Sequence, residues 1–285
     1  MYTGKTKNLG VIGYPIKHSL SPVIQNAAIA KAGLDYTYIA MPIAPEDLKV
    51  AVEGLKAINF SGFNVTIPHK LAIMQYLDEI DDTAKFIGAV NTVKIDNGKL
   101  YGYNTDVIGF INPLLKEGFD LKDKTAVILG AGGASRAIIC GLIKHGVKRI
   151  VIGVRNQAKG AKLAEGFADL VSIEAFEWHD EKFVSWLMKA DLLVNTTPLG
   201  MFPNVDNMPP VDWDKVNENA FVYDIIYTPA ETRFLQEAKK HGHKILNGER
   251  MLAEQGAASL RYWTGADVDV DIMVKTLREY LATNK

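Results

Sequence analysis

Short apolar runs alternate with amphipathic stretches along most of the chain, and this alternation predicts strands that alternate with helices. In the first part of the chain, strands are expected at 9–13, 36–41, 60–65, 89–95 and 99–103. Helices are expected there at 21–33, 45–57 and 106–116. Ser21 followed by Pro22 is typical of a helix start, with a capping serine and a proline at the first helical position.

The rest of the chain is more regular. Strands are expected at 125–129, 149–154, 191–195 and 221–226, and helices at 133–145, 157–168, 231–241, 249–263 and 269–281. The run 125–129 is largely apolar and ends in glycines, as expected of a strand that is buried on both faces. The alternation favours an α/β fold with parallel sheets. The irregular segment 198–210 is either a mobile flap or a plain surface connection.

Length and composition narrow the class of protein. A chain of 285 residues exceeds what one hydrophobic core usually organises, so two domains are expected. The 32 basic and 33 acidic residues leave a net charge of −1 without a basic arm, which disfavours nucleic acid and membranes as partners. The single Cys140 and the lack of a long apolar segment predict a cytoplasmic protein. His241 and His243 lack a third ligand and indicate a helix end rather than a metal site.

A glycine-rich turn stands between a predicted strand and a predicted helix. It consists of Gly130, Ala131, Gly132, Gly133 and Ala134. The next residue, a serine, takes the place of the third glycine in the usual G-x-G-x-x-G pattern. Bare backbone lets a diphosphate come close, and the helix N-terminus offers it free N–H groups and a partial positive charge. The turn therefore predicts a dinucleotide-binding site.

The end of the next strand distinguishes NAD from NADP. An NAD site places an acidic residue about 20 residues beyond the glycines, where it accepts a hydrogen bond from the ribose 2′-hydroxyl. Here Arg155 and Lys159 occupy that region, and no carboxylate is present. Guanidinium forms forked hydrogen bonds with phosphate oxygens, so these cations favour NADP. A solvated basic helix start is the alternative explanation.

Polar side chains gather at or near the expected strand ends in the first 106 residues. They are Ser19, Ser21, Asn64, Thr66, Lys70, Asn91 and Asp106. Ser21 and Asp106 are each explained alone as helix caps, and Lys70 as a surface lysine. Together these side chains predict a cleft for a small polyhydroxylated ligand, which needs several directional polar partners.

Several motifs resemble those of the shikimate dehydrogenase family, in the family's order and over nearly the whole chain. They are HSLSP at 18–22, NVTIPHK at 64–70, GAVNT at 88–92, GYNTD at 102–106, GAGGA at 130–134, NTTPLGM at 195–201, DIIY at 224–227 and GERMLAEQ at 248–255. The resemblance implies two α/β domains separated by a cleft. A substrate-binding domain would span 1–105 with helices from 248–285, and a Rossmann-type NADP-binding domain would span 106–247.

The resemblance also implies an activity and residue roles. Family members reversibly reduce 3-dehydroshikimate to shikimate with NADPH, in aromatic amino-acid biosynthesis. Lys70 and Asp106 would be the catalytic pair. The substrate would be held by Ser19, Ser21, Asn64, Thr66, Asn91, Asp106, Tyr227 and Gln255. The cofactor would be held by Gly130, Ala131, Gly132, Gly133, Ala134, Arg155, Lys159, Ile225 and Gly248.

Two other functions remain open at this point. One is a quinate/shikimate dehydrogenase that uses NAD or NADP, and the other is a non-catalytic NADP-binding sensor. Asn64, Val65 and Thr66 resemble the form of this motif that is specific to shikimate, which favours the shikimate enzyme over the quinate/shikimate enzyme. A sensor would need neither Lys70 nor Asp106, and both are present. Val154 departs from the family pattern, which often has a polar asparagine immediately before the arginine.

Overall fold

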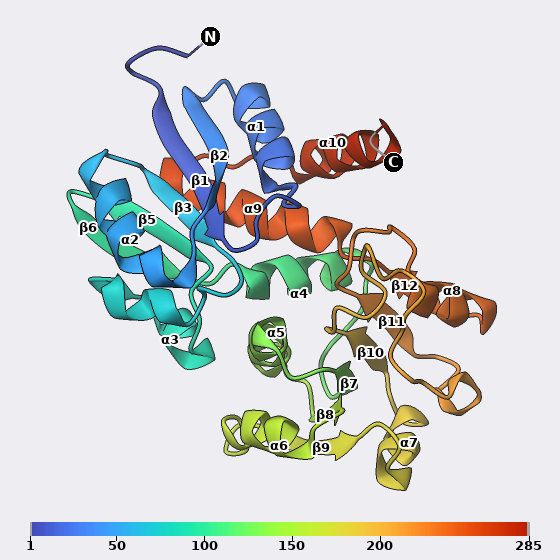
Figure 1. Cartoon of the computed structure of the whole chain (residues 1–285). Helices are drawn as coiled ribbons and strands as arrows, with labels where there is room; N and C mark the ends of the chain where they lie inside the picture. Colours follow the sequence, from blue (N-terminus) through green and yellow to red (C-terminus); the bar gives the residue numbers. More distant parts are fainter. Residues whose placement is uncertain (1, 284–285) are drawn as a thin grey trace. The chain divides into compact units, whose positions relative to one another are not determined.

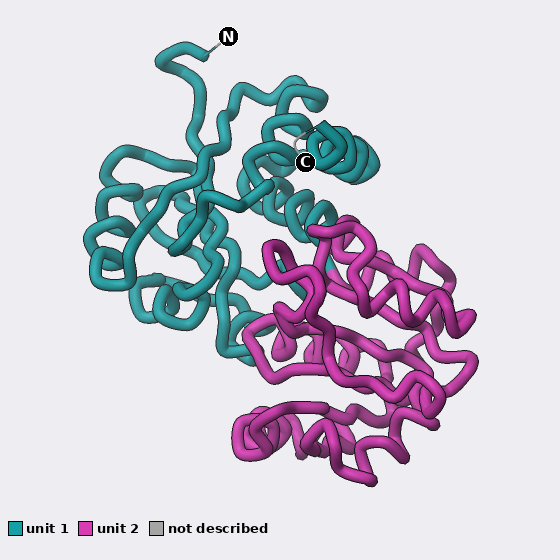
Figure 2. Tube along the Cα trace, turned by 45° about the vertical axis from the view of Figure 1, so that its right-hand side comes forward, with its two compact units in different colours: residues 1–109, 252–285 teal, residues 110–251 magenta. Residues whose placement is uncertain are grey.

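The structure is a computed structural model that describes residues 2–283. These residues form two compact units, coloured separately in Figure 2. Unit 1 holds residues 2–109 and 252–283, and unit 2 holds residues 110–251. The chain leaves unit 1 within helix α4 (Asp106–Lys116) and returns to it within helix α9 (Glu249–Thr264). Both units combine a sheet with helices, so the expected α/β class is confirmed.

Unit 1 is built on a six-stranded sheet in the order β2-β1-β3-β5-β6-β4. Its strands are β1 (Lys7–Gly13), β2 (Tyr36–Pro42), β3 (Gly62–Val65), β4 (Glu79–Ile80), β5 (Thr92–Asp96) and β6 (Lys99–Tyr103). Strand β5 runs antiparallel to β3 and β6, so the sheet of unit 1 is mixed. The cause is the turn at Asn97 and Gly98, both with positive φ, which joins neighbouring strands directly.

The helices that lie wholly within unit 1 are α1 (Ser21–Lys31), α2 (Leu48–Ala57), α3 (Asp82–Ile87) and α10 (Val270–Thr283). Helix α2 buries Leu48, Val52 and Leu55 in the unit's core. Helix α10 lies beside α1, which joins the two ends of the chain in one unit (Figure 1). Ser21 is the first helical residue and caps nothing, because Leu20 holds the N-cap position without a side-chain bond. The predicted serine cap is therefore wrong.

Unit 2 has a parallel six-stranded sheet in the order β12-β11-β10-β7-β8-β9. Its strands are β7 (Thr125–Leu129), β8 (Arg149–Val154), β9 (Ser172–Glu177), β10 (Leu192–Asn195), β11 (Phe221–Asp224) and β12 (Lys244–Leu246). Numbered from β7, this is the order 6-5-4-1-2-3 of the Rossmann fold. Ligands of such sheets bind at the carboxyl ends of the strands where the order reverses, here between β7 and β10.

Helices cover both faces of the unit 2 sheet. They are α5 (Gly133–Lys144), α6 (Gln157–Glu165), α7 (Glu181–Leu187) and α8 (Arg233–Lys240), with part of α4. On strand β7, the side chains of Ala126 and Ile128 pack in one apolar cluster, and those of Val127 and Leu129 pack in another. Burial on both faces explains why the strand has so few polar side chains, as the sequence predicts.

Two features of unit 2 concern segments that the sequence left open. The 198–210 segment makes backbone hydrogen bonds within itself and to the chain after β11, where Phe202 N–H donates to the Thr228 carbonyl at 3.0 Å. His241 is the residue that ends α8.

Within residues 2–283, no group of three or more His, Cys, Asp or Glu is arranged to hold a metal ion. No helix in the described part of the chain has the length and apolarity to cross a bilayer.

Candidate active site

A lysine and a carboxylate form a close pair in unit 1. Lys70 lies in the turn that follows β3, and Asp106 is the first residue of α4. Lys70 Nζ donates to Asp106 Oδ2 at 2.5 Å, and the two side chains are 19% and 9% exposed. The pair is therefore partly shielded from water while Lys70 keeps access to it. A shielded ion pair holds its geometry better than a surface pair, which water and salt screen.

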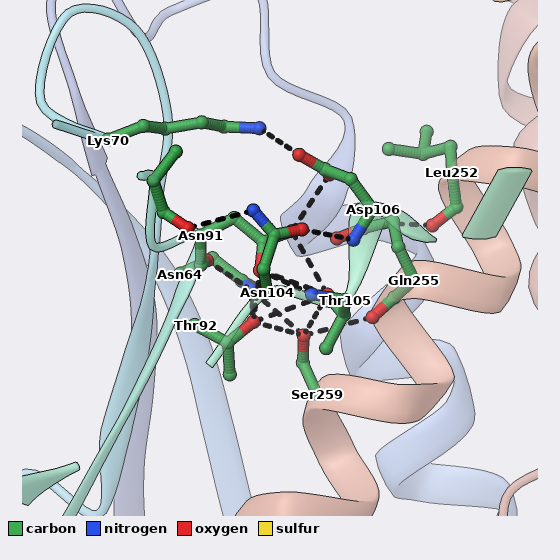
Figure 3. Close-up of polar contacts among 11 residues, drawn as sticks. Asn64, Lys70, Asn91, Thr92, Asn104, Thr105, Asp106, Leu252, Gln255 and Ser259 are labelled. Carbon is green, nitrogen blue, oxygen red and sulfur yellow. Dashed lines mark hydrogen bonds and ion pairs between the residues drawn. The ribbon is translucent and has the colours of Figure 1, made fainter. Parts of the chain in front are cut away.

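The backbone and side chains around Asp106 fix its direction. Asn91 Nδ2 donates to Asp106 Oδ1 at 2.8 Å, which leaves Oδ2 for Lys70. The Asp106 N–H donates to Asn104 Oδ1 at 3.0 Å, and Asn104 Nδ2 donates to the Ala89 carbonyl at 3.0 Å. Figure 3 shows how these side chains converge on Asp106. The carboxylate is thus held from both its own backbone and its side chain.

Most other predicted substrate residues lie in unit 1 as well. These are Ser19, Ser21, Thr66 and Gln255. Thr66 follows β3 directly, and its methyl group covers Gly13, where a Cβ would lie 2.5 Å from Thr66 Cγ2. Gln255 lies on α9 and donates to the Leu252 carbonyl at 2.8 Å. Tyr227 belongs to unit 2, where burial raises the pKa of its phenol above the usual range and keeps it a neutral hydroxyl.

Protein groups engage the whole amide of Asn64, as they do that of Asn91. Asn64 Oδ1 accepts from the Tyr38 hydroxyl at 2.7 Å. Its Nδ2 has three acceptors within 3.0 Å: the Asn91 carbonyl, Thr92 Oγ1 and Ser259 Oγ. With 6% of the residue exposed, Asn64 lies beneath Asn91. This position indicates that Asn64 holds neighbouring residues of the site, such as Asn91, in place.

The glycine-rich turn in unit 2 has the backbone that a diphosphate needs. Gly130 has φ of +112°, and a Cβ there would lie 2.8 Å from Thr196 Oγ1. Gly132 and Gly133 are exposed, and a Cβ at either would meet nothing within 4 Å. Side chains at these positions would therefore fill open space in front of the α5 N-terminus. The turn fits a dinucleotide.

Ser135 explains how the turn dispenses with its third glycine. The residue is fully buried, and its Oγ accepts from Gly132 N–H at 3.0 Å and donates to the Gly130 carbonyl at 3.1 Å. The same Oγ lies 2.8 Å from Thr196 Oγ1, just beyond β10. Its hydroxyl thus ties the turn to the strand on the other side of the sheet's reversal point. The small side chain supplies hydrogen bonds that a glycine could not.

The remaining predicted cofactor residues fall into two groups. Arg155 and Lys159 are exposed at the end of β8 and the start of α6, where the Asn156 side chain caps the helix. No ion-pair partner for either cation is found among residues 2–283. Ile225 and Gly248 lie together, since a Cβ on Gly248 would lie 2.0 Å from the Ile225 carbonyl oxygen. Only glycine permits this approach.

Sequence reasoning missed a buried carboxylate in unit 2. Asp224 ends β11 and accepts from Asn195 Nδ2 at 3.1 Å, Ile226 N–H at 3.0 Å and the Thr232 hydroxyl at 2.6 Å. Burial raises the pKa of Asp224 to about 6, against these three hydrogen bonds, which lower it. Asn195 Oδ1 accepts from the backbone and hydroxyl of Thr197. Asp224 therefore shapes the loops at the carboxyl ends of β10 and β11.

These features define a class of protein. A Rossmann-type unit with a bare glycine turn binds a dinucleotide, and a unit with a fixed lysine–carboxylate pair can move a proton. Together they are typical of a dehydrogenase that uses a nicotinamide dinucleotide.

Comparisons with known proteins identify the family. Residues 11–93 match the profile of the shikimate dehydrogenase substrate binding domain, 113–199 that of shikimate / quinate 5-dehydrogenase, and 248–278 that of the shikimate 5'-dehydrogenase C-terminal domain. The chain is 46% identical to a shikimate dehydrogenase (NADP(+)) from Methanocaldococcus jannaschii, over 96% of each chain. The chain therefore belongs to the shikimate dehydrogenase family.

Solved structures agree with this assignment. A shikimate dehydrogenase in complex with NADP+ superposes with a TM-score of 0.91 at 42% identity, covering 98% of this chain and 97% of the other. A shikimate 5-dehydrogenase from Listeria monocytogenes, in complex with shikimate and NAD, gives a TM-score of 0.91 at 36% identity and covers 97% and 98%. The fold and its two-domain organisation are those of the family.

The raised pKa of Asp224 predicts how stability depends on pH. The folded value of about 6 exceeds the usual 3.8, so the folded state binds the proton more tightly and stability falls as pH rises between these values. Relative to Asp224→Asn, the wild-type free energy of unfolding should fall by about 2 kcal/mol between pH 4.5 and 7.5. Chemical denaturation of both proteins across this range measures it. Parallel curves would contradict the assignment.

Proposed function

We propose that this chain catalyses the reversible, NADP-dependent reduction of 3-dehydroshikimate to shikimate, a step of aromatic amino-acid biosynthesis. Membership of the family and the NADP-dependent relatives support the reaction. The observation that carries the proposal is the 2.5 Å bond between Lys70 Nζ and Asp106 Oδ2. A fixed acid–base pair has no use in a protein that only senses a dinucleotide, so the structure favours an enzyme over a sensor.

Unit 1 is the substrate-binding unit in this proposal, and unit 2 binds NADP. The substrate is held by Ser19, Ser21, Asn64, Thr66, Asn91, Asp106, Tyr227 and Gln255, although Asn64 acts through its neighbours. The cofactor is held by Gly130, Ala131, Gly132, Gly133, Ala134, Arg155, Lys159, Ile225 and Gly248. The turn 130–134 takes the diphosphate, and the exposed Arg155 and Lys159 take the 2′-phosphate.

Lys70 moves the proton of the reaction. NADPH supplies a hydride when bound, and negative charge then develops on the carbonyl oxygen of the substrate. Lys70 Nζ donates its proton to that oxygen, and accepts a proton from the hydroxyl in the reverse direction. Asp106 orients Lys70 through their hydrogen bond and accepts a hydrogen bond from a substrate hydroxyl.

Quinate and NAD are the alternatives that the family itself raises. Quinate differs from shikimate in its ring and carries an additional hydroxyl, so the substrate residues must discriminate between them. Turnover of shikimate and of quinate, each with NADP and with NAD, tests the proposed function directly. The highest kcat/KM is expected for shikimate with NADP, and a preference for quinate or NAD would overturn the proposal. We propose the cytoplasm as the compartment, in keeping with a sequence that contains a single cysteine, Cys140.

Removal of the Lys70 amine tests its role. Lys70→Ala should lower kcat by about 10²–10⁴-fold, the usual contribution of a general acid–base group, with a smaller change in KM for shikimate. Steady-state kinetics of shikimate oxidation measure both constants. Lys85→Ala, an exposed lysine of the same unit, is the control and should keep wild-type rates. More than a tenth of the wild-type kcat in Lys70→Ala would refute the assignment.

The bond between Lys70 and Asp106 predicts that the two residues act as a unit. The loss in a Lys70→Ala/Asp106→Ala double variant should then be well below the sum of the two single losses in activation free energy. The values of kcat for wild type, both single variants and the double variant complete the cycle. Strictly additive losses would mean that the two side chains work independently.

Cofactor choice is tested at Arg155. A charge-assisted bond to the 2′-phosphate is worth roughly 1.5–3 kcal/mol, or about one to two decades of affinity. Arg155→Ala should therefore raise KM for NADP about 10–100-fold and leave NAD-supported activity nearly unchanged. Because Val154 is buried and supplies no polar group, the lower part of this range is expected. An equal loss with both cofactors would contradict the assignment.

A further inference from the structure

A cluster of buried hydroxyl groups lies beneath Asn91, and the proposed reaction does not assign it a role. It consists of Thr92, Thr105 and Ser259, each with no exposed surface (Figure 3). Ser259 Oγ lies 2.9 Å from Thr92 Oγ1 and 3.2 Å from Thr105 Oγ1. Ser259 comes from α9, one turn after Gln255, whereas the threonines come from β5 and from the residue before α4. The cluster joins segments that are far apart in the sequence.

The direction of each hydrogen bond around Ser259 follows from its partners. Ser259 Oγ donates its one proton to the Gln255 carbonyl at 2.9 Å, because a carbonyl can only accept. Toward Asn64 and Thr105, Ser259 Oγ therefore acts as an acceptor. Asn64 Nδ2 donates to it at 2.9 Å. The Tyr38 hydroxyl holds Asn64 in this orientation by donating to its Oδ1 at 2.7 Å.

Both threonine hydroxyls also form hydrogen bonds with the Asn91 amide. Asn91 Nδ2 donates to Thr105 Oγ1 at 3.0 Å, and the acceptors within reach of the Thr105 proton are Ser259 Oγ and Asn91 Oδ1, each at 3.2 Å. The Thr92 hydroxyl donates to Asn91 Oδ1 at 2.9 Å. Thr105 N–H donates to the same oxygen at 2.8 Å. The three contacts that involve Asn91 agree on one orientation of its amide.

This orientation matters because it places the Asn91 N–H group against Asp106. In the flipped amide, Asn91 Oδ1 would face Asp106 Oδ1 at the present 2.8 Å, and two acceptors would repel each other. Asp106 would then turn, and its other oxygen would leave Lys70. An unsatisfied acceptor or donor in so buried a cluster is also costly. The hydroxyl cluster therefore governs the geometry of the catalytic pair.

We propose that Ser259 is a positioning residue, whose hydroxyl holds the Asn91 amide in the orientation that donates to Asp106. Ser259 contacts neither Asp106 nor Lys70 and acts through Thr105 and Asn64, whereas the Thr92 hydroxyl donates to Asn91 directly. The proposal rests on the proposed function for its activity readout. It extends that function by making helix α9, which carries Gln255, a determinant of the Lys70–Asp106 geometry.

Ser259→Ala removes the acceptor and keeps the size of the side chain. Helix α9 stays anchored one turn later, where Trp263 Nε1 donates to the Val93 carbonyl at 2.9 Å and the ring covers Gly62. The variant is therefore expected to fold. The control is Thr264→Ala on the same helix, whose hydroxyl also donates to a carbonyl one turn earlier, at 2.8 Å, without contacting the cluster.

Two readouts separate positioning from plain stability. First, kcat for shikimate oxidation should fall about 3–10-fold in Ser259→Ala, the effect of one lost hydrogen bond, while KM for NADP changes less than about twofold. Second, NMR of selectively labelled protein should show shifted side-chain amide signals of Asn91 with faster hydrogen exchange. Thr264→Ala should change neither quantity. Thr92→Val, which removes the neighbouring hydroxyl with little change of shape, should move both in the same direction as Ser259→Ala.

The outcomes distinguish this proposal from the proposed function. Wild-type turnover of shikimate with NADP tests the function, and the ratio of variant to wild type tests Ser259. A kcat of Ser259→Ala within twofold of wild type would overturn the positioning role. Unchanged Asn91 amide signals would overturn it too, whatever the rate, because Ser259 would then act by another route.

Discussion

The hydrogen bond from Asn91 to Asp106 is the interaction on which the proposed catalytic pair of unit 1 depends. It occupies one carboxylate oxygen at 2.8 Å and leaves the other to Lys70 at 2.5 Å. A surface lysine and aspartate at similar separation would gain little, because water and side-chain entropy offset the attraction. Here burial and a directed amide keep the pair in one geometry. A proton carrier is useful only when its position is fixed relative to the reacting atom.

In unit 2, buried polar side chains likewise hold the proposed binding site in place. Its turn must leave the backbone bare at Gly132 and Gly133, which removes the side chains that would otherwise stabilise it. Ser135 and Thr196 replace that stability with hydroxyl bonds across the reversal point of the sheet. One strand further, Asp224 binds Asn195 and the backbone after β11. In both units, buried polar residues hold the groups that are proposed to meet ligands.

Local sequence patterns predicted the parts whose causes are local. Strands β7 and β8 match the expected ranges 125–129 and 149–154, because buried parallel strands are continuous apolar runs. Strand β9 (Ser172–Glu177) was missed, since it lies at the edge of the sheet and half of its residues are exposed. The short helices α3 and α7 were missed for lack of a long apolar period. The glycine turn and the Lys70 motif were predicted, whereas the support from Ser259 was not. Ser259 and Asn64 are 195 positions apart, and only the folded chain brings them together.

The account's central claim is that Lys70 and Asp106, as held by Asn91, meet the reacting hydroxyl. A crystal structure of this protein with shikimate and NADP+ tests it most directly. The account predicts that the hydroxyl to be oxidised lies within hydrogen-bond reach of Lys70 Nζ, about 2.6–3.2 Å, with Asp106 still bonded to Asn91. A shikimate bound with that hydroxyl beyond reach of Lys70, directly or through one water, would contradict it.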